Sequence, residues 1–358
     1  MEKMINYDDD VYSSMTAVIG VVNVPLFGVY RNVSELIEGQ DVRLVKLSVN
    51  AQASASELSG ELKEFDIVIA GSSPIYNKDL FRRLPKLKAV VRWGVGYDNV
   101  ILKDATEEGV IASRLPSYVL KDSVAELTIA LILSSLRRIP QAFDYVKRGG
   151  WKNHDLDGLK SVIGLNLEDL VVGIIGLGNI GFRVLELLKP FKPKKIFVYD
   201  PYIPASQVRM AGAEPVSNLD ELLINSDIIT IHAPLTSETK HMINREKFAK
   251  MKRGVCLINT ARGGIIDTNA LIWALEQGIV GFAALDVFDP EPIPPDHPIL
   301  KFKNIVLTPH IGSGTMKSYA MMDEYSIAES LRILRGQKPL WILNPEVLKS
   351  PKLRTKIQ

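Results

Sequence analysis

The sequence is poor in cysteine and in net charge, and it has no long apolar run. Cys256 is its only cysteine, so an intramolecular disulfide is excluded and a reducing cytoplasm is expected. Lys and Arg total 43 against 41 for Asp and Glu, a net charge of +2, which makes nucleic acid and anionic membranes poor candidates as partners. The most apolar helix-length stretch, residues 124–136, includes Glu126, and the N-terminus lacks a signal-peptide pattern. Neither export nor membrane insertion is therefore expected.

Histidine is also scarce, which shortens the search for a general acid or base. The five histidines are His154, His232, His241, His297 and His310. At 358 residues, with 46% hydrophobic and 23% charged residues, the chain has the composition of a globular protein of about two domains. No metal site is expected.

Short apolar runs rich in β-branched residues alternate with helix-like segments over residues 16–112, and this predicts a parallel α/β layer structure. The expected strands are 16–22, 41–47, 66–70 and 89–93, and the expected helices are 33–37 and 76–84. A long helix is expected over 123–146, with Pro140 ending or kinking its first half.

A second alternating series begins at Leu170. Strands are expected at 170–175, 195–199, 227–231, 254–258, 281–287 and 304–308, and helices at about 180–189, 218–224, 244–250, 268–277 and 318–334. Six strands in this order are what a doubly wound dinucleotide-binding domain requires.

A glycine-rich turn follows the first strand of this second series. Gly176, Gly178 and Gly181 form a GxGxxG pattern between a buried-strand pattern and an amphipathic helix that stops at Pro190. The three glycines would provide a tight turn, close approach of a pyrophosphate, and close packing of helix on strand. Phosphates would bind at the helix N-terminus, where the N–H groups and the helix dipole favour negative charge.

Asp200 ends the next expected strand, nineteen residues after Gly181. A carboxylate at this place accepts hydrogen bonds from a ribose 2′-hydroxyl and repels a 2′-phosphate, and no basic residue follows until Arg209. NAD is therefore favoured over NADP, and the alternative is an Asp-Pro turn in which the aspartate only caps the backbone.

Three polar residues follow strands of the second series and together could handle a 2-oxoacid. His310 comes directly after the last strand and is the candidate proton donor, whereas His232 fits a backbone-positioning role near the cofactor. Arg262, flanked by glycines, could bind a carboxylate bidentately, and Glu291 beside an imidazole would favour its protonated form. Taken singly, each residue could equally be structural or solvated.

Four ordered segments resemble motifs of the D-isomer-specific 2-hydroxyacid dehydrogenase family: GLGNIG at 176–181, NTARGGIID at 259–267, ALDVFDPEP at 284–292 and TPHIGS at 308–313. The likeness extends from about residue 66 through VVRWGVGYDNV at 90–100 and SVAEL at 123–127 to NPEVL at 344–348. It implies an NAD-dependent oxidoreductase in which His310 is the acid/base, Glu291 its partner and Arg262 the substrate anchor. It also implies cofactor contacts along the second series: Gly176, Gly178, Asn179, Ile180, Gly181, Asp200, His232, Pro234, Thr260, Ala261, Arg262, Asp286, His310 and Gly312.

The segment 94–99 supplies a candidate carboxylate site. Its glycines would expose backbone N–H groups as an anion-binding nest, with Val95 and Gly96 as the substrate-binding residues, although a plain turn is the alternative. Arg92 and Trp93 are interpreted as strand residues, with Arg92 a weak further substrate candidate.

The resemblance also implies a domain arrangement. A flavodoxin-like substrate domain would comprise residues 1–118 and be completed by residues 314–358, with a Rossmann NAD-binding domain, residues 119–313, inserted between them. Helix 123–139 would serve a homodimer.

The sequence narrows the substrate without naming it. Gly71-Ser72-Ser73 stands where phosphoglycerate dehydrogenases of this family usually carry an arginine, so a small unphosphorylated 2-oxoacid such as glyoxylate or hydroxypyruvate is favoured over 3-phosphoglycerate chemistry. An NAD(H)-sensing co-regulator like the C-terminal-binding proteins is another alternative. That branch usually has a tryptophan shortly after the histidine, where this chain has Gly312-Ser313-Gly314.

Overall fold

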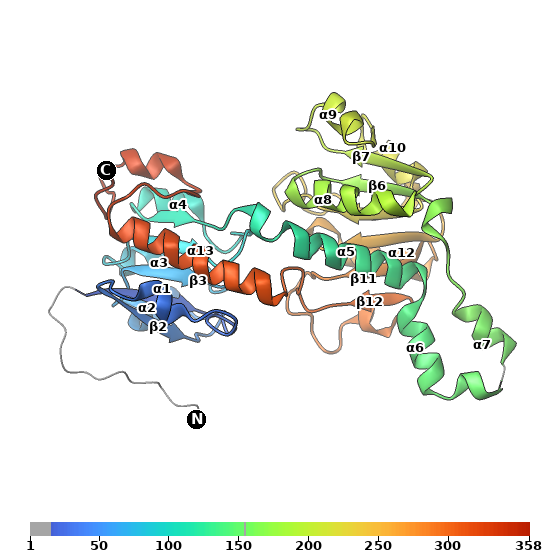
Figure 1. Ribbon diagram of the computed structural model, residues 1–358, viewed down its shortest axis with the longest axis horizontal. Coiled ribbons are helices and arrows are strands. Elements are labelled where there is room, and N and C mark those ends of the chain that lie inside the picture. The colour runs from blue at the N-terminus through green and yellow to red at the C-terminus, as the bar shows by residue number, and fades with distance from the viewer. Residues whose placement is uncertain (1–15, 154) are drawn as a thin grey trace. The chain divides into compact units, whose positions relative to one another are not determined.

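The computed structural model describes residues 16–153 and 155–358, so His154 and the N-terminal fifteen residues lie outside the described part (Figure 1). The chain divides into two compact units. Unit 1 holds the residues up to Val119 together with Thr315–Gln358, and unit 2 holds Leu120–Gly314. Each unit is built on its own parallel sheet.

Unit 1 contains a five-stranded sheet in the order β2-β1-β3-β4-β5, which is the flavodoxin-like order 2-1-3-4-5. Its strands are β1 (Ala17–Val22), β2 (Val42–Leu47), β3 (Ile67–Ala70), β4 (Ala89–Arg92) and β5 (Ile111–Ser113). Its helices are α1 (Val33–Ile37), α2 (Ala55–Leu62), α3 (Lys78–Arg83), α4 (Leu102–Glu107) and α13 (Met316–Leu334). β3 and β4 are buried along their whole length, as expected for inner parallel strands covered on both faces.

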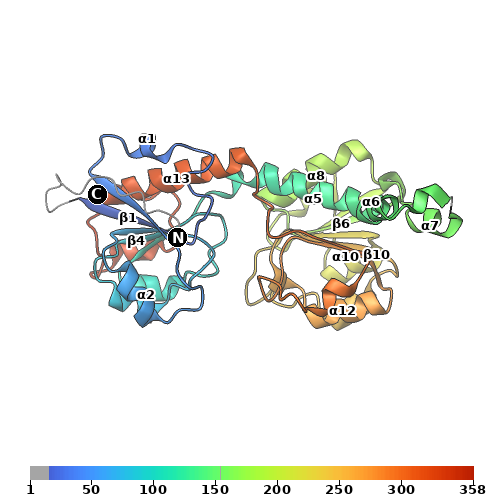
Figure 2. The same cartoon turned by 90° about the horizontal axis from the view of Figure 1, so that it is seen from below.

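The last part of the chain completes unit 1. Helix α13 packs with α1 against one face of the sheet, where Ile327 and Leu331 join the buried side chains of β1 and β3, and Figure 2 shows α2 on the opposite face. The side chain of Asn344 accepts a hydrogen bond from Ala112 N and donates to Val110 O. Residues from both ends of the chain therefore share one core.

Unit 2 contains a seven-stranded parallel sheet in the order β12-β11-β10-β9-β6-β7-β8. Its strands are β6 (Val171–Ile175), β7 (Lys195–Tyr199), β8 (Glu214–Pro215), β9 (Ile228–Ile231), β10 (Val255–Asn259), β11 (Val280–Leu285) and β12 (Ile305–Leu307). Its helices are α5 (Lys121–Leu136), α6 (Ile139–Lys147), α7 (Leu156–Ser161), α8 (Asn179–Leu188), α9 (Ala205–Met210), α10 (Leu219–Asn225), α11 (Arg245–Lys250) and α12 (Thr268–Glu276). The strand order reverses beside β6, so the carboxyl ends of β6 and β9 form the switch point at which ligands bind in such folds.

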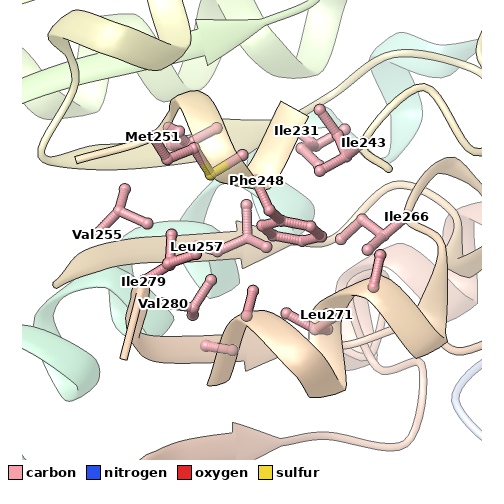
Figure 3. Close-up of a cluster of buried hydrophobic side chains, with 14 of the residues drawn as sticks. Ile231, Ile243, Phe248, Met251, Val255, Leu257, Ile266, Leu271, Ile279 and Val280 are labelled. Carbon is pink, nitrogen blue, oxygen red and sulfur yellow. The ribbon is translucent and has the colours of Figure 1, made fainter. Parts of the chain in front are cut away.

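The sheet of unit 2 lies between two helical layers. Figure 2 shows α5 and α8 on one face and α10 and α12 on the other. Figure 3 shows the core of the second face, with the buried ring of Phe248 among side chains that include Leu257 of β10 and Leu271 of α12. This packing fixes the strand ends from which the site loops start.

The expected two doubly wound parallel sheets are confirmed, whereas several details differ. The helix expected over 123–146 is two helices, because Arg138 adopts a left-handed conformation (φ 51°) and Pro140 occupies the first turn of α6. The short helices α2, α4, α7 and α9 and the short strands β5 and β8 were not predicted, because each has too few residues for a clear periodic pattern. No helix in the described residues is long and apolar enough to cross a membrane.

Candidate active site

The glycine-rich turn of unit 2 connects β6 to α8 and has no room for side chains at two of its three glycines. Gly176 has φ +88°, and a Cβ there would lie 2.8 Å from Ala233 N. A Cβ on Gly181 would lie 2.1 Å from Gly176 O, so only glycine allows α8 to pack this closely on the strand. A Cβ on Gly178 would meet nothing within 4 Å, which leaves open space over the turn.

Helix α8 offers its N-terminus to an anion. Gly178 is the N-cap residue, and no side chain caps the helix. The N–H groups of Gly178 and Ile180 accordingly have no acceptor among the described residues. A ten-residue helix with an uncapped N-terminus beside open space fits the pyrophosphate of a dinucleotide. The residues present therefore fit an NAD site.

Asp200 directly follows β7 and lies beside this turn. Its Oδ2 accepts a hydrogen bond from Leu177 N at 2.8 Å, and its Oδ1 accepts from Tyr202 N at 2.9 Å. The contact with Tyr202 N is the backbone cap expected of an Asp-Pro turn. It uses only one lone pair of a carboxylate that has about four acceptor sites. Asp200 can therefore cap its own turn and still accept hydrogen bonds from a ribose hydroxyl.

His232 follows β9 and is unsuited to proton transfer. Burial lowers the pKa of His232 to about 3, so the ring is neutral at physiological pH. Its Nε2 pairs with Thr230 Oγ1 at 2.9 Å, while its buried Nδ1 has no partner within residues 16–153 and 155–358. Its backbone lies against Gly176, which places it beside the glycine turn. In the same loop, Pro234 O accepts a hydrogen bond from Thr239 Oγ1 at 2.6 Å.

His310 lies beyond β12 and pairs with Glu291. The distance from His310 Nδ1 to Glu291 Oε1 is 2.5 Å, and the two side chains are 43% and 36% exposed. Nε2 has no partner among the described residues, so it is the ring nitrogen left to meet a substrate. His310 has φ +51°, a left-handed conformation that is uncommon for non-glycine residues, and its N–H donates to Asp286 O.

Glu291 is held as a carboxylate by its surroundings. Partial burial acts to raise the pKa of Glu291. The hydrogen bond and charge of His310, the N–H of Phe288 and the charge of Arg262 outweigh burial, and the pKa falls below its usual value. Glu291 therefore stays ionised through the neutral range. Glu291 contacts His310, and Glu291, His310 and Arg262 all follow strands of the unit 2 sheet at their carboxyl ends.

The loop after β10 presents Arg262. Buried Asn259 braces this loop, because its Nδ2 donates to Arg262 O at 2.9 Å and its Oδ1 accepts from Ala261 N at 3.0 Å. Arg262 Nη1 donates to the neighbouring carbonyl of Ala261 at 2.7 Å. The hydroxyl of Thr260 pairs with that of Thr128 on α5 at 2.9 Å. Loop and helix thus fix the backbone from which the guanidinium extends.

Asp286 ties the His310 segment to the end of β11. It is fully buried, and its Oδ1 accepts from Thr308 Oγ1 at 2.6 Å and from Ile311 N at 2.8 Å. Its Oδ2 accepts from Gly312 N at 2.8 Å. Three of about four acceptor sites are thereby used within the protein, so one remains for the cofactor contact that the resemblance implies.

The candidate carboxylate nest belongs to unit 1. The N–H groups of Val95 and Gly96 have no acceptor among the described residues, which is the property that an anion nest requires. Arg92 lies on β4 as expected, whereas Trp93 lies just beyond the strand. Arg92, the weak further substrate candidate, is only 7% exposed as a residue, and its Nε and Nη1 donate to the backbone carbonyls of Gly96, Ala70 and Gly71.

Asn259 and Thr308 support the site but were not singled out in the sequence. Both stand at strand ends inside the motifs that contain Arg262 and His310. A polar residue at the carboxyl end of an apolar strand needs a partner where it is shielded from water, as Asn259 fully and Thr308 partly are, and this signal could have identified them. No cluster of His, Cys, Asp or Glu that could hold a metal is present in the described residues.

Comparison with known proteins agrees with this geometry. A model of the NAD-binding domain of D-isomer specific 2-hydroxyacid dehydrogenases matches residues 129–312. A glyoxylate reductase of Thermofilum pendens is 38% identical over 296 residues, which cover 83% of this chain and 86% of that protein. A D-3-phosphoglycerate dehydrogenase of Methanocaldococcus jannaschii is 37% identical over 308 residues, which cover 86% of this chain but only 57% of that protein.

A solved structure shows the same similarity. A D-lactate dehydrogenase from Aquifex aeolicus, determined with NAD and lactic acid, is 29% identical to this chain, with a TM-score of 0.76. The match covers 92% of this chain and 97% of that one. The ordered motifs, the two parallel sheets and these matches lead to one conclusion. The chain belongs to the D-isomer-specific 2-hydroxyacid dehydrogenase family, whose members are NAD-dependent oxidoreductases that act on 2-hydroxy acids.

Proposed function

We propose that this protein reduces a small unphosphorylated 2-oxoacid, such as glyoxylate or hydroxypyruvate, to the D-2-hydroxyacid with NADH. The observation that carries the proposal is the His310–Glu291 pair, a proton donor held by a carboxylate at the carboxyl end of a parallel sheet. Unit 2 would be the NAD-binding domain and unit 1 the substrate domain.

Each residue has a role in the proposed reaction. NAD(H), when bound, supplies or accepts the hydride. His310 Nε2 donates a proton to the carbonyl oxygen of the oxoacid in reduction and removes it in oxidation. Glu291 pairs with Nδ1, so that the ring presents Nε2 to the substrate. Arg262 binds the carboxylate and carbonyl oxygens of the substrate, and the N–H groups of Val95 and Gly96 bind the carboxylate.

Asp200 supports the preference for NADH over NADPH. Its carboxylate is fixed beside the glycine turn by Leu177 N, and a ribose 2′-phosphate placed there would meet like charge. The capping contact with Tyr202 N leaves this charge in place. We therefore propose NAD as the physiological coenzyme.

The proposal of an unphosphorylated substrate rests on the end of β3. Gly71 and Ser73 stand there, the hydroxyl of Ser73 accepts a hydrogen bond from Asn23 Nδ2, and the nearby guanidinium of Arg92 is turned toward backbone carbonyls. The segment Gly71-Ser72-Ser73 itself supplies no arginine to bind a phosphate group. The glyoxylate reductase of T. pendens, matched over most of its length, supports the same substrate class.

A panel of 2-oxoacids tests the proposal. We expect NADH oxidation with glyoxylate or hydroxypyruvate at least tenfold more efficient, as kcat/KM, than with phosphohydroxypyruvate, and NADPH at least tenfold less efficient than NADH. Asp200→Ala should narrow the coenzyme difference without changing the order of substrates. Binding of NADH with no turnover of any 2-oxoacid would overturn the enzyme proposal and favour a dinucleotide-sensing role. Equal use of NADPH by the wild type would refute the role of Asp200.

We also propose a homodimer. The expected surface, helix 123–139, is mostly packed within unit 2 as α5, where Ala125, Leu131 and Ile132 are buried against α8 and the sheet. Large exposed apolar side chains lie further along the chain, on α6, α7 and the segments around them (Figure 1). They are Ile139, Phe143, Val146, Trp151, Leu156, Ile163 and Leu165, each between 53% and 68% exposed. Exposed apolar side chains gathered in one stretch of the chain, here residues 139–165, are typical of a subunit interface, and a second copy of the chain is the occupant that the family resemblance favours.

Lysines introduced among these exposed apolar residues should separate the subunits. Phe143→Lys combined with Trp151→Lys places two unpaired charges in the proposed interface, so the dissociation constant should rise by roughly 100-fold or more. Sedimentation velocity should give about twice the 39.7 kDa chain mass for the wild type and a monomer for the variant. Ile224→Lys, at a 52% exposed apolar position on α10, is the matched control and should remain dimeric. A monomeric wild type would refute the dimer.

A reducing cytoplasm is proposed as the working compartment. Burial raises the pKa of the Cys256 thiol to about 12, so the only cysteine is neither an exposed thiolate nor half of an internal disulfide.

A further inference from the structure

Three consecutive backbone carbonyls after β4 are each held by a donor from within unit 1. Gly94 O accepts from Leu115 N at 3.1 Å. Val95 O accepts from Arg114 Nη1 at 3.3 Å, and Gly96 O accepts from Arg92 Nε at 2.9 Å. Each of these three peptide groups is therefore held at its carbonyl oxygen.

The N–H groups of the same three peptides are unused donors. In a trans peptide the C=O group and the following N–H group point in opposite directions. With three carbonyls turned toward the protein, the N–H groups of Val95, Gly96 and Tyr97 are turned away from those donors. None of the three has an acceptor among the described residues. Three successive free N–H groups form an array that fits the two oxygens of a carboxylate.

Arg92 has the strongest hold on this loop. Its Nε reaches Gly96 O, while its Nη1 donates to Ala70 O and Gly71 O at the end of β3. One buried guanidinium thus connects the ends of two neighbouring strands to the loop. Its planar fork makes this possible, because an ammonium group lacks three donors in a fixed plane. A charged donor on Gly96 O also polarises the Gly96–Tyr97 peptide, which strengthens the N–H of Tyr97 as a donor.

Arg114 is a second, weaker support. It is half-buried, its hydrogen bond to Val95 O is longer than that of Arg92, and its guanidinium lies over the ring of Tyr97, 5.4 Å from the centroid. The two arginines therefore hold adjacent peptides of one loop from two different strand ends.

We propose that Arg92, assisted by Arg114, is a positioning residue that shapes the Val95–Tyr97 amide array for the carboxylate of a 2-oxoacid. The inference rests on the proposed function, since it concerns the same substrate. Arg92 acts through the backbone and does not touch the substrate, so its loss should weaken carboxylate binding more than it slows the chemical step.

Variants of Arg92 test this in the full-length protein. Arg92→Met should raise the KM for glyoxylate and the dissociation constant of oxamate, a non-reducible 2-oxoacid analogue, by roughly 30-fold, with kcat changed less than threefold. Arg92→Lys keeps the charge and one contact, so its KM and dissociation constant should lie between those of Arg92→Met and the wild type. Arg114→Met should raise both constants about fivefold. Arg43→Met, at an exposed arginine on β2, is the matched control and should behave as the wild type. NADH binding, a property of unit 2, should be unchanged in all four variants.

The outcomes separate the inference from the proposed function. An active wild type whose Arg92→Met and Arg92→Lys variants both keep KM within twofold overturns the inference alone. If Arg92→Met does not fold, the amide resonances of Val95, Gly96 and Tyr97 in the wild type decide, since they should shift when oxamate is added to the NADH complex. No shift overturns the inference. A wild type that shows these shifts but reduces no 2-oxoacid supports the amide array and overturns the proposed function.

Discussion

Replacement of His310 by glutamine is expected to lower kcat for glyoxylate reduction by about three orders of magnitude, while NADH affinity stays within twofold. General acid catalysis typically raises the reaction rate 10²–10⁴-fold. Glutamine can donate a hydrogen bond but cannot transfer a proton near neutral pH. Glu291 would keep a neighbour of similar size, so the loop should retain its shape. Steady-state kinetics and NADH fluorescence titration measure the two quantities.

His241→Gln is the matched control for this experiment. His241 shares the left-handed backbone of His310, with φ +52° against +51°, and it also faces a carboxylate, Asp289, at 3.7 Å. It differs in lying outside the proposed catalytic group. We expect full activity from this variant, and a His310→Gln enzyme with kcat within threefold of wild type would remove His310 from the mechanism.

Loss of Arg262 should produce the second large effect. Arg262→Ala removes a bidentate, charge-assisted contact, and at roughly 3 kcal/mol for such a pair kcat/KM for a 2-oxoacid should fall by about 150-fold. Arg262→Lys keeps the charge but not the planar pair of donors, so its kcat/KM should fall by about tenfold. Because Asn259 holds the loop through backbone groups, neither change should alter the fold.

Arg253→Ala controls for the loss of an arginine in the same unit. Arg253 and Arg262 stand at opposite ends of β10, and each donates to a backbone carbonyl, Arg253 to Gln277 O at 2.7 Å. Only Arg262 lies at the carboxyl end, where ligands bind in such sheets. Equal kinetics of wild type and Arg262→Ala would contradict the anchoring role.

The fold was largely predictable because buried parallel strands are nearly continuous apolar runs. The segments at 67–70, 228–231 and 255–259 stand out in the sequence for this reason, and the structure buries each of them completely. Short elements carry too few residues for a periodic pattern. Helix α4 has six residues and β8 has two, so their places are decided by tertiary packing and not by local pattern.

The site was predictable only where one residue type has one evident chemistry. Gly176 and Gly181 could be found in the sequence because a GxGxxG turn between a strand and a helix has few alternatives, whereas His310 could be singled out only together with Arg262 and Glu291. The residues that hold the site loops in place could not be found in this way. Whether Asp286 meets solvent, a ligand or its own loop depends on the hydrogen bonds to Thr308, Ile311 and Gly312, which only the folded chain reveals. Arg92 could likewise have faced a substrate or the backbone until its neighbours were known.

The stitching of unit 1 by the end of the chain has a consequence for biosynthesis. All seven strands of unit 2 are made before Glu329, which accepts hydrogen bonds from Ser113 Oγ and Trp341 N, and before Arg354, which donates to Leu84 O. Domains generally fold as units during synthesis. Unit 2 can therefore fold on the ribosome before α13, the last long helix of unit 1, has been synthesised. Unit 1 begins to be synthesised first but completes its fold last.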